Sequence, residues 1–192
     1  MSAIGEYLLQ SRAALDQAIA DPGFEKTVES IAARIEAALR AGNKVLIAGN
    51  GGSAADAQHI AGELLSRLYY DRAPLPAVAL TTDSSVLTAV ANDYGYEHVF
   101  ARQVAGLGRE GDVLLALSTS GRSPNILAAI RAARMARLTV IGFTGAGGGE
   151  MAESCDLCLR APSDSTPIIQ QIHIVVGHIV CALVEQRLFP RR

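Results

Sequence analysis

The chain is 192 residues long, 49% hydrophobic and close to neutral, with a formal net charge of −2. This length and composition suit one domain with its own core and exclude an intrinsically disordered chain. The small negative charge gives no support to nucleic-acid binding through a basic surface. The N-terminus lacks a basic stretch followed by an apolar run, and we find no apolar segment long enough for a bilayer, so we expect a cytoplasmic protein without a membrane segment. Three cysteines, a small and odd number, also fit the reducing cytosol.

Two helices are predicted first in chain order. Apolar residues recur at helical spacing over 6–20 and 25–41, and Asp21-Pro22-Gly23 separates these two segments. Gly42 follows the second segment, where glycine commonly ends a helix. The sequence therefore predicts a helical segment, 1–42, followed by an α/β core, 43–192, within a single domain over 1–192.

The core alternates between two periodicities. Short apolar runs, typical of strands buried on both faces, lie at 44–49, 76–80, 112–117, 138–143 and 156–160. Helical segments lie between them, at 53–68, 84–92, 97–107, 124–136 and 147–153. This alternation predicts an α/β fold: a five-stranded parallel sheet flanked by helices in three layers, flavodoxin-like or Rossmann-like. A last helix, 167–188, is apolar almost all round, which predicts burial in the core or in a subunit contact.

Two loops at predicted strand ends suit an anion. The first, 49–54, has the sequence GNGGSA, whose glycines allow close approach of the backbone at a helix N-terminus. The second, 118–124, has the sequence STSGRSP, whose four hydroxyls can donate to phosphate oxygens. An ordinary turn remains open for the second loop, with Ser123 as a helix cap and Pro124 as the first helical residue.

A nucleotide site is the alternative for the first loop, because it matches the dinucleotide fingerprint G-x-G-x-x-A. The next acidic residue after the following strand is Asp83, about thirty residues on, where the fingerprint expects about twenty. We also expect no second domain to carry a substrate for hydride transfer. We therefore favour a phosphate over a dinucleotide.

Polar side chains stand where helices are otherwise apolar. His59 and Glu63 are four residues apart and share a helix face, as an exposed pair or a metal or catalytic pair would. Gln170, His173 and His178 interrupt the last helix, where each is either a bonded core group or a functional one. Gln170 and His178 lie about 12 Å apart along a regular helix and roughly 80° around it. Sharing one metal would need long reach or a second subunit, which hints at a site at a subunit contact.

Cys155 and Cys158 have the spacing of a redox or zinc motif. They fall at a predicted strand, where residues three apart point to opposite faces, and no second pair accompanies them. We expect two cysteines without a role.

Several separate motifs resemble one family. These are GNGGSAADAQHIAGELLSR at 49–67, NDYGY at 92–96, GDVLLALSTSGRSPN at 111–125 and IQQIHIVVGHIV at 169–180. They resemble the bacterial phosphoheptose isomerases, the sedoheptulose 7-phosphate isomerases of the sugar-isomerase (SIS) fold. The similarity runs from about residue 25 to the C-terminus. One departure is Gln171, where relatives usually have glutamate.

The resemblance implies roles for particular positions. The implied catalytic acid/base pair is Glu63 and His178. The implied ligands of one Zn²⁺ per subunit are His59, Glu63, Gln170 and His178. The residues implied to contact the substrate are Asn50, Gly51, Gly52, Ser53, Glu63, Asn92, Asp93, Ser118, Thr119, Ser120, Ser123 and Gln170. It also implies a homotetramer with active sites between subunits, and an enzyme of heptose biosynthesis for lipopolysaccharide or capsule.

A binding protein is the alternative in another functional class. Relatives of the same fold associate with the replication initiator, and Leu188-Phe189-Pro190 resembles that branch. The resemblance implies that those proteins lack the acidic and histidine pair that this chain has at Glu63 and His178. A sugar-phosphate-sensing regulator would bring a DNA-binding domain, and none is visible in the sequence.

Overall fold

The computed structural model describes residues 2–191, so the two outermost positions of the predicted range 1–192 lie outside it. Its elements in chain order are α1 (Ala3–Ala20), α2 (Pro22–Arg40), β1 (Val45–Gly49), α3 (Gly52–Leu65), β2 (Ala77–Ala79), α4 (Ser84–Tyr94), the 3₁₀ turn η1 (Tyr96–His98), α5 (Val99–Leu107), β3 (Val113–Leu117), α6 (Pro124–Met135), β4 (Thr139–Thr144), α7 (Met151–Ser154), β5 (Leu157–Arg160) and α8 (Thr166–Leu188). Every predicted helix and strand is present. The division between residues 42 and 43 stays a prediction.

The predicted five-stranded parallel sheet is confirmed. Its strand order is β2-β1-β3-β4-β5, and every neighbouring pair is parallel. The chain leaves β1 toward one edge and then returns to its other side with β3. The strand order therefore reverses between β1 and β3, and open α/β sheets bind ligands at the carboxyl ends of the strands that flank such a point.

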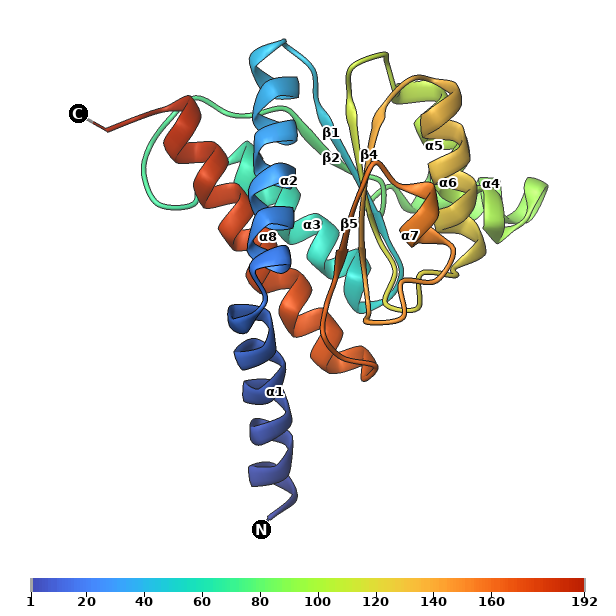
Figure 1. The fold of residues 1–192 in the computed structure, drawn as a ribbon. Coiled ribbons are helices and arrows are strands. Elements are labelled where there is room, and N and C mark those ends of the chain that lie inside the picture. Colours follow the sequence, from blue (N-terminus) through green and yellow to red (C-terminus); the bar gives the residue numbers. More distant parts are fainter. Residues whose placement is uncertain (1, 192) are drawn as a thin grey trace.

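Helices cover both faces of the sheet because each central strand is apolar on both sides. Along β1, Val45 and Ile47 join the core under α2, α3 and α8, whereas Leu46 and Ala48 join the core under α5 and α6. Figure 1 shows these two helical layers on opposite sides of the strands. The period-two alternation thus produces the predicted three layers.

Helix α1 projects beyond the rest of the molecule and continues into α2 through a short break (Figure 1). The break follows from Asp21, whose carboxylate accepts a hydrogen bond from Gly23 N, and from Pro22 at the start of α2. Most of α1 packs against little: Ile4 is 74% exposed and Ile19 is 83% exposed.

Helix α8 corrects the expectation that no segment is long enough to cross a bilayer. Over Thr166–Leu188 its length and hydropathy satisfy that test, but half of the qualifying window is buried within the protein. It also holds His173 and Glu185 fully buried, so it is a core helix of the α/β body.

The segment after β4 differs from its prediction in two ways. The helix expected over 147–153 begins only at Met151, because Gly148 and Gly149 adopt positive φ angles of 74° and 57°.

Cys155 lies before β5 rather than in it. Its sulfur and that of Cys158 lie on the same side, next to Gly142, where an added Cβ would be 2.7 and 3.5 Å from the two sulfurs. The expectation that these cysteines point apart is wrong. A hydrogen bond between the thiols, with burial, raises the pKa of Cys155, and the same bond lowers the pKa of Cys158.

Candidate active site

The first anion loop joins β1 to α3 and needs glycine at two positions. Gly51 has a φ of 58°, and a Cβ on Gly49 would lie 2.4 Å from the Ser53 carbonyl oxygen. Gly51 also occupies the cap position of α3 and offers no side-chain cap, while Ser53 is buried beneath the turn. The start of α3 therefore presents backbone N–H groups and a favourable dipole at the carboxyl end of β1.

The second loop follows β3, the neighbour of β1, and its hydroxyls bond to one another. Ser118 and Ser123 lie with their Oγ atoms 2.9 Å apart, and Ser120 Oγ accepts a hydrogen bond from Arg122 N at 3.2 Å. Ser123 occupies the cap position of α6, but its hydroxyl does not cap the helix. The ordinary capping interpretation of Ser123 therefore fails, and its hydroxyl belongs to the loop.

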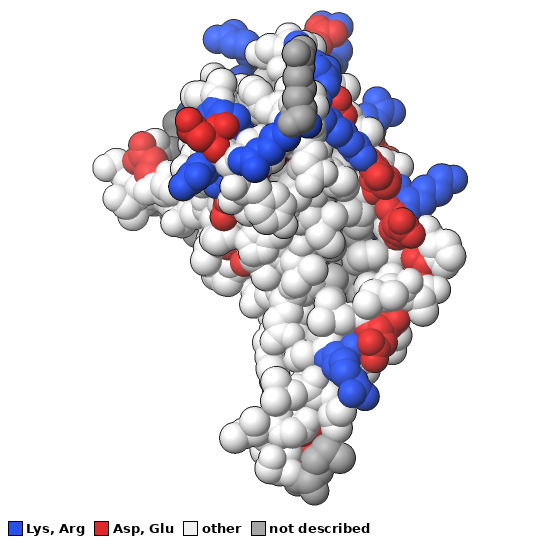
Figure 2. All heavy atoms as spheres, turned by 90° about the vertical axis from the view of Figure 1, so that its left-hand side faces the viewer, with Lys and Arg blue, Asp and Glu red and all other residues white. Residues whose placement is uncertain are grey.

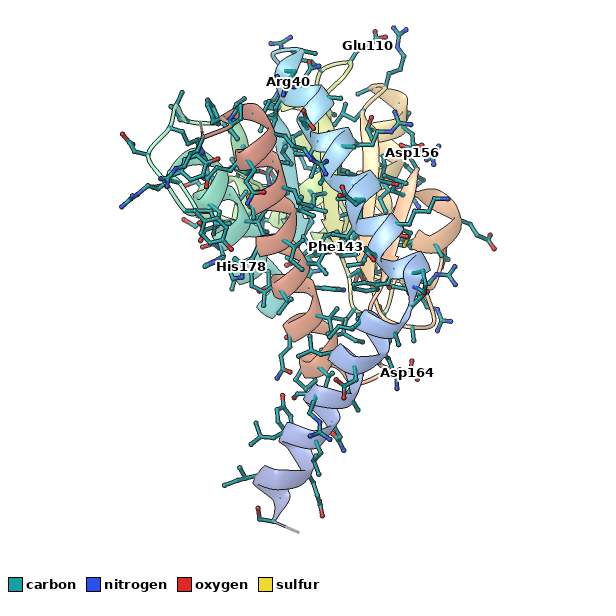
Figure 3. The ribbon with its side chains drawn as sticks, turned by 60° about the vertical axis from the view of Figure 1, so that its left-hand side comes forward. Arg40, Glu110, Phe143, Asp156, Asp164 and His178 are labelled. Carbon is teal, nitrogen blue, oxygen red and sulfur yellow. The ribbon has the colours of Figure 1, made fainter. Side chains whose placement is uncertain are left out.

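Three potential ligand atoms converge between α3 and α8. His59 Nε2 lies 2.8 Å from His178 Nε2 and 3.2 Å from Glu63 Oε1, and ligand atoms of all three residues lie within 4.8 Å of one another. Helical spacing puts His59 and Glu63 on the face of α3 that α8 covers, and Figure 3 shows His178 on α8 facing that helix. Residues far apart in the chain thus form one cluster.

The donor set suits a borderline metal ion. Two imidazole nitrogens and one carboxylate oxygen form a ligand combination known from catalytic zinc sites, which keep a fourth position open. The neighbouring Asp56 adds a carboxyl group on α3; burial raises its pKa, and the nearby His59 partly opposes that effect.

The Gln170 side chain lies beside the start of α3. Its side-chain amide lies against Gly52, where a Cβ would come within 2.6 Å of Nε2 and 2.7 Å of Oε1. His59 is two turns further along α3, about 10 Å along a regular helix. The structure thus brings together three of the four residues assigned to the metal and puts the fourth beside the first anion loop.

Asn92 and Asp93 lie on the exposed face of α4. Asn92 Nδ2 donates to Asp93 Oδ1 at 2.8 Å, and among the described residues no hydrogen bond joins either one to the two loops. Thr119 is half-buried, and its carbonyl accepts a hydrogen bond from Gly145 N, which ties the second loop to the end of β4.

Two residues near the loops were not singled out from the sequence. Tyr96 donates to Asn50 Oδ1 at 3.2 Å, and Asn125 exchanges two hydrogen bonds with the Asn50 amide. Both lie inside the motifs quoted above, NDYGY and GRSPN, so their position in those motifs was the available signal.

The sequence is similar to a known domain family and to named enzymes. The SIS domain model matches residues 6–145. The phosphoheptose isomerase of Burkholderia pseudomallei strain K96243 is 60% identical over 174 residues, which cover 91% of this chain and 88% of that protein. The Rhodospirillum rubrum phosphoheptose isomerase is 64% identical over 154 residues, covering 80% and 82% of the two chains.

Solved structures of phosphoheptose isomerases also resemble this chain over nearly its whole length. The phosphoheptose isomerase from Francisella tularensis superposes with a TM-score of 0.91 at 39% identity, covering 97% of this chain and 100% of that one. The enzyme from Neisseria gonorrhoeae gives a TM-score of 0.88 at 41% identity over 95% and 97% of the two chains. The chain therefore belongs to the phosphoheptose isomerase family, and its α/β body is a SIS domain.

Proposed function

We propose that this protein interconverts sedoheptulose 7-phosphate and D-glycero-D-manno-heptose 7-phosphate, and so supplies heptose for a bacterial lipopolysaccharide or capsule. Beyond membership of the family, the convergence of Glu63 and His178 carries the proposal. These two side chains come from different helices and meet in the ligand cluster with His59. A protein that only binds a partner has no use for an acid and a base at one point.

The phosphate of the substrate is assigned to the two loops at the point where the strand order reverses. Asn50, Gly51 and Gly52 offer backbone and amide donors. Ser53, whose backbone N–H is bonded to the Asn50 carbonyl, offers its hydroxyl, as do Ser118, Thr119, Ser120 and Ser123. These contacts hold the sugar in place and contribute positioning energy rather than chemistry. The ligand cluster lies about two turns of α3 from the first loop, a separation that suits an extended seven-carbon sugar phosphate.

Proton transfer is assigned to Glu63 and His178. In the direction from ketose to aldose, the Glu63 carboxylate removes a proton from C1, and the electron pair of that C–H bond forms the C1–C2 double bond of an enediol(ate). Glu63 then returns the proton to C2, while His178 moves a proton between the oxygens on C1 and C2. Acid/base groups of this kind each contribute about 10²–10⁴-fold.

A zinc ion, one per subunit, is proposed for His59, Glu63 and His178, with Gln170 as the fourth residue of the set. Bound there, it would polarise the carbonyl and hydroxyl oxygens of the substrate as a Lewis acid. A carboxylate that ligates a metal is a poorer base, so Glu63 acts as base in the state in which it is free of the metal.

We also propose a cytoplasmic homotetramer whose active sites include residues from neighbouring subunits. Asn92 and Asp93 support this arrangement, because both are exposed on α4 and, among the described residues, no hydrogen bond joins either one to the two loops. An apolar groove along α1, α2 and α8, discussed below, supports it as well.

The test is incubation with sedoheptulose 7-phosphate and detection of the aldose product. We expect turnover by the wild type and by Glu153→Gln, a control at an exposed carboxylate on α7. Glu63→Gln is expected to lose turnover by at least about 10²-fold while inorganic phosphate still binds. Chelation of the metal is expected to abolish turnover, and added zinc to restore it.

Undiminished turnover in Glu63→Gln would refute the base assignment. A wild type that never forms the aldose, but binds the replication initiator tightly, would instead favour the binding-protein alternative.

A further inference from the structure

A reciprocal pair of asparagine side chains joins the two anion loops. Asn50 Nδ2 donates to Asn125 Oδ1 at 2.9 Å, and Asn125 Nδ2 donates back to Asn50 Oδ1 at 2.8 Å. Asn50 follows β1 in the first loop, and Asn125 is the second residue of α6, directly after the second loop. The pair therefore fixes the spacing between two segments that come from separate βα units.

Burial makes Asn125 a fixed partner. Its side chain belongs to a residue that is only 3% exposed, and it lies among the apolar residues of the first turns of α6, so its amide cannot turn to water. Leaving such a group without its bond is unfavourable, because it has lost its water and gained no partner. Asn50, half-buried, is therefore oriented by Asn125 and not the reverse.

Tyr96 contributes the third bond, and a count of donors and acceptors gives its consequence. A side-chain amide has two N–H donors and two lone pairs on its oxygen. The lone pairs of Asn50 Oδ1 accept from Asn125 and from Tyr96, and one Asn50 N–H is given to Asn125. In this orientation the Asn50 side chain has one N–H donor left, so its amide can serve a ligand only as a donor.

We propose that Asn125 and Tyr96 are positioning residues that hold the Asn50 amide as a pure donor toward an oxyanion, the substrate phosphate. A free asparagine could turn its oxygen to the ligand and repel it. Turning Asn50 alone would set its oxygen against Asn125 Oδ1, so the pair opposes that orientation. This inference rests on the proposed function for the identity of the substrate, but phosphate binding tests it separately.

The main test is Asn125→Leu, which keeps the size of the side chain and removes both bonds to Asn50. We expect KM for sedoheptulose 7-phosphate to rise about tenfold with kcat changed less than twofold, because Glu63 and His178 are untouched. The dissociation constant for inorganic phosphate, measured by titration calorimetry, should rise by the same factor. An unchanged KM and phosphate affinity in the folded variant would overturn the proposal, as would a loss confined to kcat.

A double-mutant cycle separates positioning from a merely structural role. In an Asn50→Ala background there is no amide to orient, so Asn125→Leu should change KM and phosphate affinity less than twofold. An equal, additive loss in both backgrounds would mean that Asn125 acts on the fold and not through Asn50, and would overturn the proposal.

Tyr96→Phe provides a second variant at an exposed position, where loss of folding is not at issue. It removes one of the two hydrogen bonds to Asn50 Oδ1, and we expect a two- to threefold rise in KM and in the phosphate dissociation constant. No change in either would overturn the role of Tyr96. A wild type without isomerase turnover would defeat the proposed function, whereas the calorimetric comparison would still decide the role of the network.

Discussion

Two histidines five residues apart on α8 have opposite environments. His178 joins the ligand cluster with His59 and Glu63, whereas His173 is fully buried and its Nε2 donates to the Thr144 carbonyl oxygen at 3.1 Å. The ring of Phe143 packs against His173, and neither this ring nor the Thr144 carbonyl carries an ionisable group. Burial lowers the pKa of His173 to about 4, and the bond to Thr144 only partly opposes this effect.

The depressed pKa of His173 predicts a loss of stability in mild acid. The unfolded chain takes up this proton near pH 6.5 and the folded protein only near pH 4, so unfolding is favoured as the pH falls between these values. At about 1.4 kcal/mol per pH unit, the stabilisation present above pH 6.5 falls by about 2 kcal/mol by pH 5. Denaturant unfolding at pH 7.5 and pH 5 measures this difference.

The matched control is His173→Gln, which keeps an N–H donor for the Thr144 carbonyl but does not titrate. We expect this variant to be less stable than the wild type at pH 7.5, with a pH dependence smaller by about 2 kcal/mol over the same range. Equal pH dependence in both proteins would show that His173 is not the group responsible.

The polar residues that interrupt α8 could be predicted from the sequence, but their roles could not. Periodicity identified Gln170, His173 and His178 as polar interruptions of an apolar helix, but it left core and functional roles open for each. The tertiary contacts distinguish these roles. His173 bonds to the carbonyl of Thr144 at the end of β4, whereas His178 lies against His59 on α3. Asn125 escaped notice since its partner, Asn50, lies in a separate loop.

At the element scale, α3 and α8 pack side by side, and one buried ion pair joins α8 to the segment that follows α3. Arg72 Nε lies 3.1 Å from Glu185 Oε2, and the two side chains are 2% and 1% exposed. Arg72 also donates to the carbonyls of Glu63 and Leu64 at the end of α3. Burial disfavours the charge of Glu185, but hydrogen bonds from the Leu68 and Tyr69 amides and from Arg72 outweigh it and hold the pKa of that carboxyl low.

Arg72→Met is expected to destabilise the protein by about 3–5 kcal/mol, because it leaves a buried carboxylate without its cation and α3 without its capping donors. Arg12→Met is the control at an exposed pair, Arg12 with Asp16, and should cost less than about 1 kcal/mol. Both values come from denaturant unfolding at neutral pH. Similar costs for the two variants would contradict a special role for the buried pair.

The elements themselves were largely predictable from local pattern. Continuous apolar runs identified all five strands, and the burial of β1, β3 and β4 on both faces follows from helices on both sides of the sheet. The strand order was not deducible from periodicity, since the position of β1 between β2 and β3 depends on pairing between distant segments. The late start of α7 reflects backbone angles at Gly148 and Gly149 that a period count does not capture.

At the scale of the whole molecule, one face is unusually apolar for a free surface. A groove of about 580 Å³ runs between α1, α2 and α8, lined almost entirely by apolar side chains, among them Leu15, Phe24, Val28, Val175 and Ile179. Figure 2 shows that few charged side chains interrupt the lower part of the face containing the projecting α1. Large contiguous apolar patches on soluble proteins mark interaction sites, so this face supports the proposed assembly of several copies of the chain.

Ile179→Asp tests that assembly. Ile179 lines the groove and is 43% exposed in the single chain, so an aspartate there is solvated in a monomer but would lose its water in a subunit contact. We expect the variant to dissociate to smaller species in analytical ultracentrifugation, with lower turnover if neighbouring subunits supply site residues. Met135→Asp, at an 86% exposed methionine on α6, is the control and should sediment as the wild type does. Unchanged sedimentation of Ile179→Asp, or a wild type that is monomeric, would contradict assembly through this groove.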